Sequence, residues 1–332
     1  MHIPDVLIDS RASLVTTLIG AAGLAYGLRR VQDRHGARAT SLMGMTAAFV
    51  FAAQMVNFPV GPGVSGHLLG GVLSAVLLGP WAGAVVIAAV LIVQCLLFQD
   101  GGVTALGANF VNMGLIGSVV GYAIYDPIRR AVGGRRGILV GSMTAAWFSV
   151  LLAAGAFSIE LAAGGGREHF FRILSWMGLV HAGIGVGEAL ITGLVVRFVL
   201  LTRPELIEVD GEDTPETARF GFGFSTIAAG LAIALAVAVF ASPFASDAPD
   251  GLEFVGEKLG FLPDGEAPPI IRSPMVEYKL PLPIEPKGPY GVKLATAAAG
   301  LIGTLVVFGF AWSMARVFAP SNGEQGAWAD AV

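Results

Sequence analysis

The chain begins Met1-His2-Ile3-Pro4-Asp5, and a histidine directly after a free amino terminus can chelate a divalent cation. The terminal amine, the main-chain nitrogen of His2 and its imidazole Nδ1 would place three nitrogens nearly in one plane. A neutral imidazole is a common ligand, and an ionised amide requires a metal that favours tetragonal geometry. The candidates are therefore Ni²⁺, Cu²⁺ or low-spin Co²⁺, because tetrahedral Zn²⁺ fits poorly. The alternative interpretation is a chance histidine near the start of the chain.

Composition indicates the surroundings of this terminus. Hydrophobic residues make up 55% of the 332 residues and charged residues 13%, against roughly 25% charged in soluble domains. We therefore expect an all-α polytopic membrane protein in a lipid bilayer. The net charge of −4 is small and the basic residues are scattered at segment ends, so no nucleic-acid partner is expected. Cys95 is the only cysteine, which excludes an intrachain disulfide and a thiolate cluster.

Apolar runs near the spanning length of about 20 residues predict nine helices. The expected ranges are 11–28, 40–57, 67–79, 82–98, 105–125, 138–160, 172–200, 221–243 and 291–315. The first seven form one bundle and the last two a smaller unit. The predicted division is a seven-span domain over 1–204, an acidic cytoplasmic linker over 205–220, a two-span domain over 221–318 with a largely irregular outer segment over 244–290, and a cytoplasmic tail over 319–332.

Arginine distribution predicts the orientation of the chain. Basic side chains gather in three alternate connections, which contain Arg29, Arg30, Arg34 and Arg38; Arg129, Arg130, Arg135 and Arg136; and Arg203 and Arg219. Connections rich in arginine lie on the cytoplasmic side, so we expect the amino terminus outside. All four lysines conflict with this rule, because they fall in or beside the outer segment, where eight acidic residues outnumber them.

Three nitrogens leave one corner of a square plane open, and His67 is the expected fourth ligand. It begins the predicted helix 67–79 on the same outer side as Met1, and Gly66, Gly70 and Gly71 would let another backbone approach. The alternative for a histidine at a helix start is an interfacial side chain that contacts water.

Other polar side chains are expected to support the site or the bundle. Asp5 is a candidate partner for the second nitrogen of His2, because a ligating histidine commonly donates to a carboxylate. His181 and Glu188 are seven residues apart on one helix stripe, and a structural or supporting role is favoured over direct ligation. The remaining candidates for interhelical bonds or pocket positions are Gln54, Asn57, Gln94, Asn109 and Asn112.

Four stretches resemble the substrate-capture component of energy-coupling-factor cobalt and nickel transporters. They are Met1-His2-Ile3-Pro4-Asp5, Gly66-His67-Leu68-Leu69-Gly70, Asn109-Phe110-Val111-Asn112-Met113-Gly114 and His181-Ala182-Gly183-Ile184-Gly185-Val186-Gly187-Glu188. The similarity covers roughly the first 200 residues. It implies a seven-helix subunit in the cytoplasmic (inner) membrane of a bacterium, with Met1, His2 and His67 as matching ligand positions. Val6 departs from the glycine that usually follows the opening Pro-Asp.

The stretch Pro249-Asp250-Gly251-Leu252-Glu253 resembles the small two-helix accessory domain that is fused to, or encoded beside, the capture component. That domain is more typical of nickel than of cobalt systems, and we expect it to help ion loading or release. Pro-Asp-Gly is also a strong turn signal, which accounts for the local structure alone.

No Gly-xxxx-Gly-Lys-Ser/Thr phosphate loop occurs in the sequence, so we expect a non-enzymatic transport subunit that needs separate partners for ATP hydrolysis. The resemblance identifies these partners as a membrane coupling subunit and ABC-type ATPase subunits. The expected cargo is Ni²⁺ or Co²⁺, with no resident cofactor. The alternative is a stand-alone secondary permease that couples protons through His181 and Glu188. A membrane metalloenzyme is disfavoured, since a filled square plane leaves no open metal position.

Overall fold

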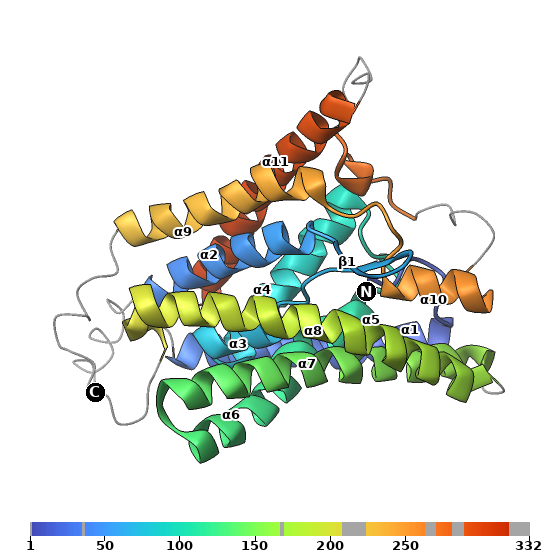
Figure 1. The fold of residues 1–332 in the computed structure, drawn as a ribbon, viewed down its shortest axis with the longest axis horizontal. Coiled ribbons are helices and arrows are strands. Elements are labelled where there is room, and N and C mark those ends of the chain that lie inside the picture. Colours follow the sequence, from blue (N-terminus) through green and yellow to red (C-terminus); the bar gives the residue numbers. More distant parts are fainter. Residues whose placement is uncertain are drawn as a thin grey trace, which may run out of the picture.

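The computed structural model describes residues 2–34, 37–166, 169–207, 224–262, 270–280 and 289–318. Most of its long helices lie side by side, with α7 (Gly134–Leu161) and α8 (Phe170–Thr202) along the lower part of the view and α9 (Phe224–Ala236) and α11 (Pro289–Phe318) along the upper part (Figure 1). The predicted all-α architecture is confirmed.

The remaining helices of the first unit are shorter or interrupted. They are α1 (Ser10–Arg34), α2 (Ala37–Gln54), α3 (Gly71–Leu78), α4 (Pro80–Val93), α5 (Leu106–Asn109) and α6 (Gly121–Val132). A π-helical segment, Gln94–Phe98, extends α4, and a second one, Phe110–Val120, joins α5 to α6.

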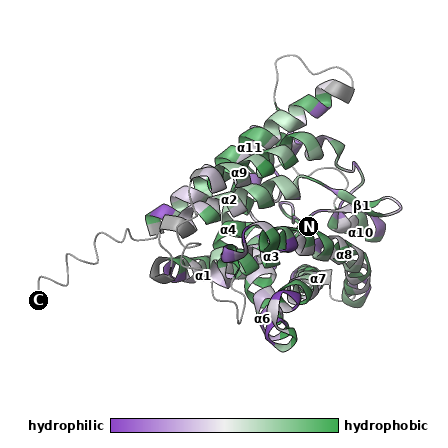
Figure 2. Cartoon of the chain, turned by 60° about the vertical axis from the view of Figure 1, so that its left-hand side comes forward, coloured by the Kyte–Doolittle hydropathy of each residue, from purple (hydrophilic) through white to green (hydrophobic). Residues whose placement is uncertain are grey.

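Seven helical stretches of the described chain are long and apolar enough to cross a membrane. Five belong to the first unit and two to the second, and they span Ser10–Val31, Pro80–Phe98, Leu106–Val132, Gly134–Gly164, Phe170–Thr202, Ser225–Phe244 and Gly291–Val317. With the shorter α2 and α3, the first unit has the seven expected helices. The protein is a multi-pass membrane protein, and Figure 2 shows hydrophobic residues along most helices, with hydrophilic residues gathered at ends such as that of α6.

The prediction that His67 begins a helix over 67–79 is wrong. Residues 67–70 are not helical, and α3 begins only at Gly71. Gly70 has a left-handed φ of 77°, and a Cβ there would lie 2.8 Å from Val50 Cγ1, so this backbone conformation needs glycine. Eight helical residues rise about 12 Å, far short of a hydrocarbon core about 30 Å thick. The loop that carries His67 is therefore an irregular segment inside the bundle.

Two further elements shape the same end of the molecule. Strands β1 (Phe58–Gly61) and β2 (Val64–Gly66) form a small antiparallel hairpin between α2 and His67. In the outer segment, which we expected to be largely irregular, residues Gly251–Leu259 form helix α10. Asp250 is its N-cap and forms a capping box with Glu253, so the Pro-Asp-Gly turn signal marks a helix start. Nearly all of the predicted linker, and the whole predicted tail, lie outside the described residues.

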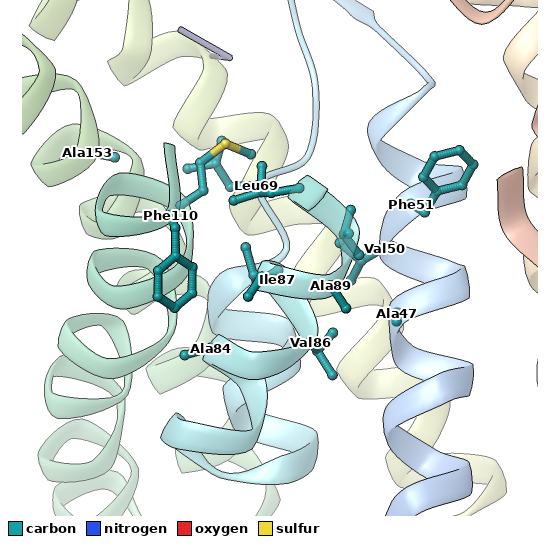
Figure 3. Close-up of a cluster of buried hydrophobic side chains, with 14 of the residues drawn as sticks. Ala47, Val50, Phe51, Leu69, Ala84, Val86, Ile87, Ala89, Phe110 and Ala153 are labelled. Atoms are coloured by element: carbon teal, nitrogen blue, oxygen red, sulfur yellow. The ribbon is translucent and has the colours of Figure 1, made fainter. Parts of the chain in front are cut away.

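The apolar core surrounds α4, whose residues are almost all buried. Val86 and Ala89 of α4 lie toward Ala47 and Val50 of α2, while Ile87 lies on the side of Phe110 with Leu69 above it (Figure 3). Because α4 is enclosed by apolar side chains, its Gln94 end is a fixed support for polar groups beyond the core.

Candidate metal site

The first described residues are anchored on α5 and on the loop that precedes it. Asn109 accepts from the Ile3 main-chain N–H at 2.8 Å and donates to the Ile3 carbonyl at 3.1 Å. The same carbonyl accepts from the Gly102 N–H at 2.8 Å. A Cβ on Gly102 would lie 2.2 Å from the Asp5 nitrogen, so only glycine permits this close approach. Asn109 and Gly102 thereby fix the start of the chain inside the protein.

This anchoring brings His2 against His67. The two imidazoles are stacked, with centroids 4.9 Å apart and an interplanar angle of 18°. Only 6% of the His2 side chain and 5% of the His67 side chain are exposed. Two histidines separated by 64 intervening residues in the sequence thus form one buried pair.

A polar network holds the His2 ring. Its Nδ1 lies 3.0 Å from Asp100 Oδ1, and its Nε2 lies 3.2 Å from Gln94 Oε1. Gln94 Nε2 donates to the Tyr278 hydroxyl oxygen at 3.2 Å, and the Tyr278 hydroxyl donates to Asp100 Oδ2. Each ring nitrogen of His2 therefore faces an oxygen acceptor, and the one hydrogen of the neutral ring can be donated to only one of them.

The His67 loop is held from two sides. On the inner side, Glu188 of α8 accepts the main-chain N–H groups of Leu69 at 2.6 Å and Gly70 at 2.9 Å. On the other side, Ser65 of β2 donates its main-chain N–H to the Pro249 carbonyl at 2.9 Å. The loop therefore connects α8 to the segment that precedes α10.

His67 itself faces a carboxylate. Its Nδ1 lies 3.0 Å from the Leu68 carbonyl oxygen, and its Nε2 lies 3.8 Å from Asp250 Oδ2. The other carboxylate oxygen of Asp250 accepts the N–H groups of Leu252 and Glu253 at 2.8 and 2.9 Å. One side chain thus caps α10 and faces the second imidazole.

Both histidines line a cavity of about 850 Å³. Its lining includes six carboxylates, from Asp5, Asp100, Asp250, Glu253, Glu257 and Glu277. A concave, acidic surface attracts cations and raises their local concentration. The cavity therefore provides a cation-attracting approach to the histidine pair.

Burial controls the charge of the site. It lowers the pKa of His2 from 6.5 to about 3, and the pKa of His67 likewise to about 3. Both imidazoles are therefore neutral near pH 7 and carry a lone pair that a metal ion can use. Burial raises the pKa of Asp100 in the same cavity.

The expected supporting residues are distributed around this pair. Asp5 accepts from the Thr104 N–H and hydroxyl at 2.8 and 2.7 Å, while Asp100, and not Asp5, contacts His2. Asn57 lines the cavity and its carbonyl accepts from the Ser246 N–H at 2.8 Å. Gln94 contacts His2 directly.

Two expected polar residues, Asn112 and His181, make their hydrogen bonds to groups other than the histidine pair. Asn112 donates to Glu160 at 2.9 Å, between helices. His181 Nδ1 lies 2.8 Å from the Met177 carbonyl oxygen, and its Nε2 has no hydrogen-bond partner among the described residues. Met1, the first predicted ligand, lies outside the described residues, so its part in the site remains a prediction.

Sequence reasoning missed three side chains of the site, Asp100, Asp250 and Tyr278. Asp100 stands in Gln99-Asp100-Gly101-Gly102, where adjacent glycines after a helix were a signal for close backbone approach. Asp250 was recognised as part of the accessory-domain stretch and its turn, and not as a side chain that faces His67. Tyr278 follows the histidine pair by more than 200 residues and no local pattern marks it.

Within the described part of the chain, no group of three or more His, Cys, Asp or Glu side chains is arranged to hold a metal ion. Two imidazoles alone make an incomplete site. Amide and amine nitrogens suit the tetragonal metals, and the expectation that main-chain nitrogens beside His2 complete the site stays a prediction.

Membrane-spanning helices that enclose a histidine pair at one end of a bundle define a multi-pass membrane protein with an internal polar site. A family model described as cobalt uptake substrate-specific transmembrane region matches residues 2–206, and the chain belongs to this family. A PDGLE domain model matches residues 225–320. The family resemblance noted in the sequence, including the fused accessory domain, is confirmed.

The chain is similar to known transport proteins over nearly all or part of its length. A putative fused nickel transport protein of Archaeoglobus fulgidus is 35% identical over 317 residues, which cover 95% of this chain and 98% of the relative. A fused nickel transport protein of Rhodobacter capsulatus is 31% identical over 221 residues, covering 62% of this chain and 64% of that protein. The crystal structure of a transition metal transporter superposes with a TM-score of 0.55 at 29% identity and covers 60% of this chain and 93% of that structure.

Proposed function

We propose that this protein captures Ni²⁺, or Co²⁺, from outside the cytoplasmic membrane as the substrate-binding subunit of an ATP-driven transporter. The ion would be held by the Met1 amine, the His2 main-chain nitrogen, His2 Nδ1 and one imidazole nitrogen of His67. Ionisation of one amide lowers the net charge of the loaded site by one unit, which eases burial of a divalent cation.

The stacked, buried and neutral pair of His2 and His67 is the observation that carries this proposal. A histidine at position 2 would ordinarily be solvated, since chain ends are poorly ordered unless they are tied down. Here Asn109 and Gly102 hold the backbone of Ile3, which directly follows His2, and the His2 ring lies at an acidic cavity. Such an arrangement is costly without a ligand that uses it.

Nickel is favoured over cobalt by the relatives. Both full-length and partial relatives that carry a fused second unit are named as nickel transport proteins, although others in the family are named as cobalt transport proteins. The proposed ligand set accepts either ion and would bind Cu²⁺ more tightly, so availability would decide occupancy in the cell.

Partner subunits would be needed for ATP hydrolysis. The sequence has no phosphate-binding loop, so nucleotide hydrolysis would come from ABC-type ATPase subunits through a membrane coupling subunit. The arginine-rich connections support an outside location for the amino terminus. The ion would then enter the acidic cavity directly from the exterior.

The decisive experiment adds one glycine before Met1 in a form that is not removed. This change moves the amine out of chelating position, and we expect Ni²⁺ affinity of the purified protein to fall about a hundredfold, since one ligand contributes about 3 kcal/mol. Calorimetry and metal analysis measure the loss. Unchanged affinity would contradict terminal chelation.

A matched control inserts one glycine between Gly133 and Gly134, far from the pair. Both residues have positive φ and no atom within 4 Å of their Cβ positions, so the turn has room. We expect this insertion to leave Ni²⁺ affinity unchanged.

A further inference from the structure

We propose that Tyr278 of the second unit is a positioning residue of the metal site: it orients the Gln94 amide, which holds His2 in the tautomer that leaves Nδ1 available to the ion. This inference rests on the proposed function, because it concerns how the same site is prepared for its ligand. The second unit, here called the accessory unit, comprises the described residues from 224 to 318.

The direction of the hydrogen bonds begins at Asp100. An ionised carboxylate can only accept, and a tyrosine hydroxyl has one hydrogen to donate. The Tyr278 hydroxyl therefore donates to Asp100 Oδ2, and its oxygen is left to accept. Gln94, whose amide nitrogen lies 3.2 Å from that oxygen, must present its NH₂ group to Tyr278.

The orientation of Gln94 then determines the tautomer of His2. With its NH₂ group on Tyr278, Gln94 presents its carbonyl oxygen to His2 Nε2 at 3.2 Å. A carbonyl oxygen only accepts, so Nε2 carries the hydrogen, and a neutral imidazole has only one N–H. His2 Nδ1 is thus left with its lone pair, and Nδ1 is the nitrogen that terminal chelation uses.

This arrangement matches what metal-bound histidines need. A ligating imidazole commonly donates its remote N–H to a carbonyl or carboxylate, which fixes ring orientation and raises ligand basicity. Gln94 supplies that carbonyl before any ion arrives. Gln94 is therefore already oriented to accept the remote N–H of His2 when the ion binds.

Asp100 competes with Gln94 for the single hydrogen of the neutral imidazole, and a bound cation removes this competition. In the Nε2–H tautomer, the lone pairs of His2 Nδ1 and Asp100 Oδ1 face each other 3.0 Å apart, which is unfavourable until a cation lies between them. Two donors bonded at about 2.0–2.1 Å to one ion, at a right angle, lie about 2.9 Å apart. A cation at His2 Nδ1 can therefore be accommodated beside Asp100 with little movement of either group.

The accessory unit holds Tyr278 firmly in place. Its ring stacks on Phe98 with centroids 4.7 Å apart and an interplanar angle of 19°. The preceding Met275 donates its main-chain N–H to the Leu97 carbonyl at 3.0 Å. These contacts fasten the Tyr278 segment to the same π-helical segment that carries Gln94, so the hydroxyl and the amide keep a fixed relation.

The test is Tyr278→Phe, which removes the hydroxyl and keeps the ring that stacks on Phe98. The Gln94 amide is then free to turn its NH₂ group toward His2, which favours the Nδ1–H tautomer. We expect Ni²⁺ affinity of the full-length protein to fall at least about tenfold, as for other supporting partners of metal ligands. Tyr26→Phe, which removes an exposed hydroxyl bonded to Arg30, is the matched control and should bind like wild type.

A rescue experiment separates the two possible roles of Tyr278, which are to orient Gln94 and to pack against its neighbours. Gln94→Glu places an acceptor at both terminal atoms, so no hydroxyl is needed to orient it. In this background we expect Tyr278→Phe to change Ni²⁺ affinity less than twofold. Pulsed electron paramagnetic resonance of Cu²⁺-loaded protein adds a direct readout, because it senses hydrogen bonding at the remote imidazole nitrogen, and that signal should change in Tyr278→Phe.

The outcomes distinguish this inference from the proposed function. If the wild type binds Ni²⁺ through its free amino terminus and Tyr278→Phe binds equally well with the same resonance signal, only the role of Tyr278 is overturned. An equal loss of affinity in both Gln94 backgrounds would also overturn it. If wild-type binding does not depend on the free terminus, the proposed function fails and this inference fails with it.

Discussion

The His2–His67 pair and the His181–Glu188 pair are both buried, but their hydrogen-bond partners differ. Those of His2 are side chains, whereas those of His181 and Glu188 are main-chain groups. Around His2, side chains contact other side chains and face an acidic cavity. On α8, both carboxylate oxygens of Glu188 accept main-chain N–H groups, and His181 contacts a main-chain carbonyl. Burial alone therefore does not indicate a binding site.

This difference bears on the choice between a capture subunit and a proton-coupled permease. A permease that uses His181 and Glu188 needs the two groups to exchange protons, but no hydrogen bond joins them among the described residues. Glu188 instead supports the loop that holds His67. The geometry favours a structural role for Glu188, and the proposed ligand role stays with His2 and His67.

The largest effect on metal binding is expected from His67→Ala. Loss of one of four ligands removes about 3 kcal/mol, so Ni²⁺ affinity should fall about a hundredfold. Calorimetry on the purified protein measures this. His169→Ala, at an exposed histidine before α8, is the control and should bind normally. Equal affinity in the two variants would remove His67 from the ligand set.

Glu188→Ala should have the largest effect on stability. It leaves the buried N–H groups of Leu69 and Gly70 without their acceptor, and each costs about 1–3 kcal/mol. The free energy of unfolding in detergent should fall by about 2–6 kcal/mol, and Ni²⁺ binding should weaken because the His67 loop is released.

Glu188→Gln sharpens the same comparison, because it keeps one carbonyl acceptor and should lose about half as much stability. If this variant kept full stability and full Ni²⁺ affinity but lost uptake, Glu188 would carry protons and the permease would be favoured.

The smallest effect is expected from His181→Leu. Leucine fills a similar volume, and the only described hydrogen bond of His181 goes to a helix carbonyl. Ni²⁺ affinity should stay within about twofold and the free energy of unfolding within about 1.5 kcal/mol. Loss of uptake with intact binding would contradict the structural role.

Sequence patterns predicted the helices well because bilayer-spanning runs are long and nearly free of charge. They failed at 67–70, where the apolar run begins with a loop and the helix forms only from Gly71. That loop is irregular because its Leu69 and Gly70 N–H groups donate hydrogen bonds to the carboxylate of Glu188, which lies 118 residues beyond Gly70 in the sequence. Hydrophobicity cannot distinguish such a buried loop from a helix, since both contain apolar residues.

The site was predictable only where the chemistry was local. His2 stood out by its place next to the chain start, and Gln94 and Asn109 stood out as amides within apolar runs. No motif identifies Asp100 or Tyr278 as a site residue, and they become part of the site only because the fold brings residues 2, 94, 100 and 278 together. Their roles depend on tertiary contacts that no short pattern contains.

The accessory unit meets the first unit through direct contacts that do not involve residues 208–223. Ser65 bonds Pro249 and Ala248, Gly251 packs on α8 with no room for a Cβ, and Tyr278 stacks on Phe98. Covalent continuity is therefore not what joins the two units at the metal site. The covalent link instead fixes the stoichiometry of the two units. Because both are synthesised as one polypeptide, each histidine pair is supplied with one accessory unit.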